Sequence, residues 1–171
     1  MFYKIENQDS KVFHKLKELR EKENAIEDLN KRLIEEKAGQ KFEVFLGHPY
    51  QRGTCRTSQY TAIEFDKPDH LCSKTWKKNK DHPTCYEPNR RTKKGREFDE
   101  FIRNLETTHY TQIFDILKLD HIINGRFTIP FLEYLDNKII MRLDDRHQPN
   151  DENIIEITSK EFEQTLNKSR S

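Results

Sequence analysis

Hydrophobic positions change their spacing along the chain, and these changes predict which segments are helical and which are extended. Over residues 11–37 the apolar residues recur at three- and four-residue steps, which predicts one long amphipathic helix. Asp9 or Ser10 can cap its start, and Gly39 can close its end. Glu23 interrupts the apolar stripe near its middle. The stripe indicates a helix that packs across a sheet, and a helical arm or a dimeric coil is the alternative.

Shorter apolar segments, bounded by Gly, Pro, Asn or Asp, predict strands and further helices. The expected strands are residues 2–6, 42–46, 60–65, 127–129, 131–135, 138–143 and 154–157. The expected shorter helices are residues 93–105, 110–119 and 159–167. Residues 168–171 are expected to fray. The element order predicts one α+β domain over residues 1–171, with a small antiparallel sheet, the long N-terminal amphipathic helix and two to three further helices.

Residues 66–96 form a basic, loop-rich segment within this predicted domain. They contain almost no aliphatic residues, so we expect an extended loop or a strand pair held by Trp76 and Tyr86. The whole chain of 171 residues has 31 Lys and Arg against 30 Asp and Glu, a net charge of +1. Nine of the cations lie within residues 74–96, where Asp81 and Glu87 are the acids. The charge is therefore segregated along the sequence, which is more informative than its total.

Cations interleaved with aromatic residues indicate a binding surface. The predicted contact residues are Lys74, Trp76, Lys77, Lys78, Lys80, Tyr86, Arg90, Arg91, Lys93, Lys94 and Arg96. Trp and Tyr anchor many protein interfaces, and they also stack on bases while Lys and Arg hold phosphates. The segment therefore fits a protein partner or a nucleic acid, and the third interpretation is a solvated loop without a partner.

Cysteine and histidine positions raise the question of a metal or a reactive thiol. Four possible ligands form two close pairs, His70 with Cys72 and His82 with Cys85. Two pairs of ligands are typical of a structural zinc site, although no Cys-x-x-Cys pair is present. Cys55 lies between two arginines, which favour a thiolate. The cysteines can be interpreted in three ways: as zinc ligands, as a catalytic thiol at Cys55, or as ordinary buried residues. Acidic pairs in loops, such as Asp144 and Asp145, are hydrated side chains more often than magnesium ligands.

Composition narrows the class of protein. No run of about 18 apolar residues is present, so we expect no membrane-spanning helix. The start has no signal-peptide pattern, and three cysteines do not make a disulfide framework, so we expect a cytoplasmic protein. Apolar residues amount to 33% and aromatic residues to 11%, which predicts a modest core built on aromatic rings. Glycine-rich phosphate loops, nucleophile elbows and metalloprotease motifs are lacking.

Three stretches resemble small accessory proteins of tailed phages and prophages. They are the opening residues 1–6 before a charged helix, residues 86–96 with an aromatic-Pro segment leading through Thr-Lys-Lys-Gly-Arg into a helix, and residues 155–162. The resemblance implies a role in host takeover, counter-defence or DNA metabolism, and it implies no catalytic residue. We therefore expect a non-enzymatic accessory protein that binds a host or defence protein through residues 74–96. A nucleic-acid-binding protein using the same segment is the alternative, and a small metal-containing or thiol enzyme is the second.

Overall fold

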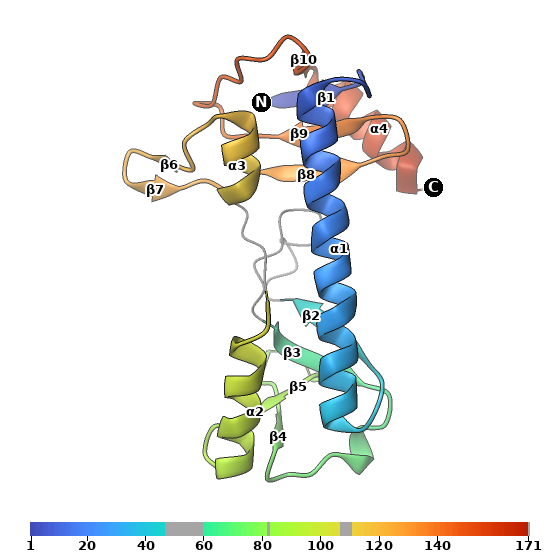
Figure 1. Cartoon of the computed structure of the whole chain (residues 1–171), viewed down its shortest axis with the longest axis vertical. Helices are drawn as coiled ribbons and strands as arrows, with labels where there is room; N and C mark the ends of the chain where they lie inside the picture. Colours follow the sequence, from blue (N-terminus) through green and yellow to red (C-terminus); the bar gives the residue numbers. More distant parts are fainter. Residues whose placement is uncertain (47–59, 82, 107–110, 171) are drawn as a thin grey trace. The chain divides into compact units, whose positions relative to one another are not determined.

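The computed structural model describes residues 1–46, 60–81, 83–106 and 111–170. Within these residues four α-helices accompany two four-stranded antiparallel sheets and a two-stranded ribbon, which confirms the α+β class and the long N-terminal helix (Figure 1). The helices are α1 (Lys11–Ala38), α2 (Lys93–Arg103), α3 (Thr111–Leu117) and α4 (Ser159–Arg170), with a 3-10 turn η2 (Pro68–His70). The strands are β1 (Phe2–Ile5), β2 (Phe42–Leu46), β3 (Tyr60–Phe65), β4 (Trp76–Lys78), β5 (Tyr86–Pro88), β6 (Ile122–Ile123), β7 (Arg126–Phe127), β8 (Phe131–Tyr134), β9 (Ile139–Arg142) and β10 (Ile155–Ile157).

The chain folds as two compact units, whereas the sequence predicts one domain. Of the described residues, the first unit contains residues 1–22 and 111–170, and the second contains residues 23–46 and 60–106. Each unit has a hydrophobic cluster of its own. An apolar count constrains the total buried surface but not its division between cores, so the composition could not indicate two clusters.

The first unit is a sheet covered by helices on both faces (Figure 1). Its strand order is β10-β1-β9-β8, so β1 lies between strands from the other end of the chain. Successive side chains of a strand point to opposite faces. Ile5 and Met141 accordingly pack with the start of α1 and with α3, whereas Ile140 and Ile157 pack with Phe162 of α4.

The second unit is a sheet of order β2-β3-β5-β4 with a largely aromatic core. Phe42 and Phe65 from the sheet pack with Ile34 of α1 and Phe98 of α2. The Trp76 ring lies 4.5 Å from the Phe98 ring and 4.8 Å from the Phe65 ring, centroid to centroid. Aromatic rings therefore supply the apolar surface that few aliphatic residues provide, as the composition predicts.

Helix α1 contributes to both cores. Leu16 and Leu19 are buried in the first cluster, and Ile34 is buried in the second. The second unit begins at Glu23, the residue at which the sequence pattern shows a break in the apolar stripe. The stripe is thus one helix serving two separate cores, in place of a continuous seam across one sheet.

Local capping chemistry sets the helix ends where the sequence predicts them, with small shifts. The Ser10 hydroxyl accepts from the Phe13 N–H at 3.3 Å, and the Thr158 hydroxyl accepts from the Glu161 N–H at 3.0 Å. Gly39 ends α1 with φ of +77°. Helix α4 continues to Arg170, three residues past the predicted end at residue 167, while residue 171 lies outside the described residues.

Candidate functional site

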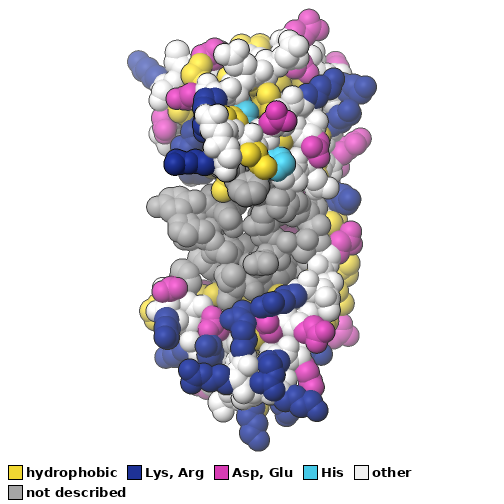
Figure 2. Space-filling model, turned by 90° about the vertical axis from the view of Figure 1, so that its left-hand side faces the viewer, with side chains coloured by type: hydrophobic (Ala, Val, Ile, Leu, Met, Phe, Trp, Pro, Cys, Tyr) yellow, Lys and Arg dark blue, Asp and Glu magenta, His cyan; other side chains and the backbone are white. Residues whose placement is uncertain are grey.

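All nine cations of residues 74–96 have exposed side chains in the second unit. They come from the turn before β4, from β4 and the turn after it, from the turn before α2, and from the first turn of α2. Figure 2 shows Lys and Arg side chains gathered over the second unit on the face turned to the viewer. The sequence prediction of an exposed cationic segment therefore matches the placement of these side chains.

Two of the nine cations are neutralised by neighbouring carboxylates. Lys77 Nζ lies 3.1 Å from Glu87 Oε1, across the β4–β5 pair. Arg90 Nη2 lies 3.3 Å from Asp99 Oδ1. The other seven form no ion pair with a described residue, and we call them the basic surface: Lys74, Lys78, Lys80, Arg91, Lys93, Lys94 and Arg96.

Asn89 joins the two stretches of chain that carry the basic surface. Its backbone N–H donates to the Thr75 carbonyl at 2.7 Å, and its side-chain amide donates to the Ser73 carbonyl at 3.2 Å. Its side-chain oxygen accepts from the Arg91 N–H at 3.2 Å. Chain segments on either side of the β4–β5 strand pair are thereby held together by one side chain and its backbone.

Thr92 and Gly95 complete the same junction. The Thr92 hydroxyl contacts the Lys74 carbonyl and accepts from the Gly95 N–H at 3.1 Å, which caps α2. A Cβ at Gly95 would overlap the carbonyl oxygen of Asn89, so this close approach requires glycine. Asn89 and Gly95 both lie in the stretch of residues 86–96 that resembles phage proteins, but the sequence pattern alone predicts no role for either of them. Their signal was an Asn-x-x-Thr-x-x-Gly spacing ahead of an apolar helical stripe.

The aromatic residues of the segment belong to the protein interior more than to its surface. Trp76 is 5% exposed and packs between Phe65 and Phe98. Tyr86 is half-buried, and its ring contacts that of Phe65. The prediction of Trp76 as a surface anchor is therefore wrong, because the second unit uses this indole to complete its core.

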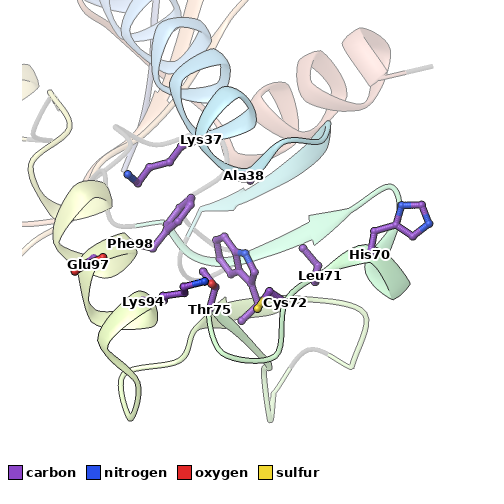
Figure 3. A pocket seen from close by; sticks show the side chains of 10 residues that line it. Lys37, Ala38, His70, Leu71, Cys72, Thr75, Lys94, Glu97 and Phe98 are labelled. Carbon is purple, nitrogen blue, oxygen red and sulfur yellow. The ribbon is translucent and has the colours of Figure 1, made fainter.

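A pocket of about 380 Å³ lies in the second unit between the end of α1, residues 70–76 and α2 (Figure 3). Lys94, a member of the basic surface, and Lys37 of α1 both line it, so the pocket places one further cationic side chain beside that surface. Lys37 Nζ lies 4.9 Å from the centroid of the Phe101 ring, a cation–π contact that holds the ammonium over α2.

The described members of the predicted zinc set do not converge. Cys85 is buried, Cys72 is exposed at the pocket, and the His70 ring lies apart from Cys72 (Figure 3). His82 and the predicted reactive Cys55 lie outside the described residues. Within the described part of the chain, no group of three or more His, Cys, Asp or Glu side chains is arranged to hold a metal ion.

The two described cysteines differ in acidity. The backbone N–H of Lys74 lowers the pKa of the Cys72 thiol, and the backbone and hydroxyl of Thr75 and the Lys94 ammonium act in the same direction. Burial raises the pKa of the Cys85 thiol. Cys72 therefore has the greater thiolate fraction at any given pH.

No helix in the described ranges is both long and apolar enough to cross a bilayer. Comparison with known protein families, with curated proteins and with solved structures finds no match to this chain. The arguments on function therefore rest on the residues themselves.

Proposed function

We propose that the chain is a nucleic-acid-binding protein that holds a phosphodiester backbone on the basic surface of its second unit. The observation that carries the proposal is the set of seven exposed cations that form no ion pair with a described residue. Nucleic acids are the polyanions for which Lys and Arg contacts supply most of the affinity, through release of condensed counterions. Such contacts fix position on the backbone without reading the bases.

The burial of Trp76 favours a nucleic acid over a host protein as the partner of this surface. Protein interfaces take most of their binding energy from a buried aromatic or apolar centre. The exposed large hydrophobic side chains among the described residues are Leu29, Ile122, Ile129 and Ile155. None of them lies within residues 74–96. The surface therefore offers charge without an apolar centre, which suits a phosphate chain.

The same burial bears on the kind of nucleic acid. Single-strand binders combine a cationic groove with exposed aromatic rings on which bases stack. Trp76 is withdrawn into the core and Tyr86 is half-buried. We therefore propose contacts to the backbone with little preference for base sequence. The resemblance to phage and prophage accessory proteins fits this proposal through their implied roles in DNA metabolism and counter-defence.

The test is the salt dependence of binding to a fluorescein-labelled DNA duplex, followed by fluorescence anisotropy. For contacts to about four phosphates, affinity is expected to fall about a hundredfold between roughly 50 and 200 mM salt. Substitution of Lys78, Arg91 and Lys93 by Gln is expected to weaken binding and to lower the salt slope by about 0.9 for each lost phosphate contact.

The matched control removes the same charge from the first unit by substituting Lys11, Lys15 and Lys160 with Gln. All three side chains are exposed. We expect this variant to bind as the parent protein does. The proposal would be contradicted if the Lys78, Arg91 and Lys93 variant bound DNA as tightly as the parent, or if the affinity did not respond to salt. The basic surface would then be assigned to an acidic protein partner.

A further inference from the structure

A groove of about 550 Å³ in the first unit combines apolar and arginine side chains. It lies where β1 begins, where β9 ends, and along the segment between the β6–β7 ribbon and β8. Phe2, Ile129 and Leu143 line it together with Arg126 and Arg142. Ile129 is 54% exposed, the largest exposed fraction among the large hydrophobic side chains that the structure describes.

The acids that line this groove are already engaged. Arg146 Nε lies 2.8 Å from Asp144 Oδ1, and its Nη2 lies 2.9 Å from Asp144 Oδ2, a two-pronged ion pair. These bonds hold the pKa of Asp144 far below its usual range. Asp145 Oδ1 accepts from the Met1 ammonium at 2.7 Å. The four charges therefore neutralise one another in pairs.

Arg126 and Arg142 remain as exposed guanidinium groups that form no ion pair with a described residue. The strand register places Arg142 between Phe2 on β1 and Phe131 on β8. Its guanidinium carbon lies 5.8 Å from the centroid of the Phe131 ring. This stacking orients the group and leaves its N–H groups available to an anion.

The apolar surface beside these arginines continues from the core under α4. Phe162 of α4 packs against Phe2 and Phe131, with ring centroids 4.7 and 6.1 Å apart. Phe2 is half-buried under this packing, and Ile129 lies farther out and is exposed. An apolar strip thus runs from the helix-covered part of the sheet into the groove.

We propose that this groove binds an acidic peptide segment of a partner protein, with carboxylates on Arg126 and Arg142 and a neighbouring apolar side chain against Phe2 and Ile129. Guanidinium groups match carboxylates in charge and in planar geometry. The half-buried Phe2 and the exposed Ile129 offer apolar surface beside the arginines, which a peptide side chain can cover and a phosphate chain cannot. This partner and this surface are additional to the proposed nucleic-acid binding.

The probe is a short acetylated and amidated peptide of alternating Glu and Phe, titrated into the labelled full chain by NMR. We expect shifts of the Arg126 and Arg142 side-chain N–H signals and of the Ile129 methyl groups. Arg126→Gln and Ile129→Thr are each expected to weaken binding about fivefold, the loss of one partly exposed contact. Both side chains are exposed, so neither substitution removes core packing.

The matched controls are Ile122→Thr and Lys160→Gln. Ile122 is 46% exposed on the other strand of the ribbon and does not line the groove, and Lys160 is an exposed cation of α4. Both variants are expected to bind the peptide as the parent does. The proposal is overturned if the peptide shifts none of the groove signals at millimolar concentration, or if Arg126→Gln and Ile129→Thr bind normally. It is also overturned if a Glu-Ser peptide binds equally well, or if duplex DNA shifts the groove signals and displaces the peptide.

Discussion

At the scale of single residues, Gly95 shows how little room the basic surface leaves for variation. The Asn89 carbonyl occupies the space that a Cβ at Gly95 needs. Asn89 also bonds to both stretches of chain that carry the cations. A change at Gly95 therefore reaches the lysines and arginines around it through the backbone.

Gly95→Ala is expected to lower the free energy of unfolding by about 2 kcal/mol or more, because the backbone of Asn89 must move. The measurement is urea unfolding, together with duplex affinity, which is expected to fall as the two stretches separate. Gly39→Ala is the control. Its φ of +77° is strained for alanine, but nothing lies within 4 Å of the added Cβ. Gly39→Ala is therefore expected to cost about 1 kcal/mol and to leave DNA binding intact. Equal losses of affinity in the two variants would argue against the positioning role of Gly95.

The two described cysteines give a second prediction at this scale. Cys72 has a lowered pKa and an exposed side chain, whereas Cys85 has a raised pKa and is 5% exposed. Iodoacetamide near neutral pH is expected to alkylate Cys72 at least about tenfold faster than Cys85. Peptide mapping by mass spectrometry measures both rates in one sample. The difference between the two alkylation rates is expected to shrink as the pH rises and both thiols ionise. Similar rates near neutral pH would contradict the conclusion that Cys72 is the more reactive thiol.

At the scale of elements, the sequence predicts best the features whose signals are local. The Thr158 and Glu161 capping box, the glycine that ends α1 and the Asp136-Asn137 turn between β8 and β9 are encoded within a few residues. Even the alternative of a strand pair in the basic segment is realised as β4 and β5. Cap and turn chemistry depend on the neighbouring backbone and need no knowledge of the fold.

The parts of the candidate sites that escape prediction depend on contacts between distant residues. An indole between lysines has the same sequence pattern whether it faces solvent or, like Trp76, a core. Arg126 lies on β7 of the two-stranded ribbon and Arg142 on β9 of the four-stranded sheet, and the fold brings both to one groove although they are distant in sequence. The sequence therefore predicts the charge of the basic surface, but it predicts neither the burial of Trp76 nor the groove.

At the scale of the whole molecule, two cores share one helix. Leu16 and Ile34 lie on that helix, and both side chains are 0% exposed, one in each hydrophobic cluster. Packing of each cluster depends on its own strands, and the two sheets have no strand in common. A substitution that weakens the packing of one core is therefore expected to lower the local stability of its own unit first.

Leu16→Ala and Ile34→Ala serve as reciprocal controls for this expectation. Each is expected to cost about 2–5 kcal/mol through lost packing. Hydrogen exchange followed by mass spectrometry is expected to quicken in β1 and β9 for Leu16→Ala, and in β3 and β5 for Ile34→Ala. Equal quickening in all four strands with either substitution would mean that the two units open as one.

The strand order of the first unit also determines when its strands can pair during translation. Phe2 on β1 pairs with Arg142 on β9 and with Ile157 on β10, so β1 leaves the ribosome well before both of its partner strands. The described residues of the second unit all lie within residues 23–106. The second unit of a nascent chain can therefore fold before β9 and β10 are synthesised. Until then both edges of β1 are unpaired and can pair with strands of other chains.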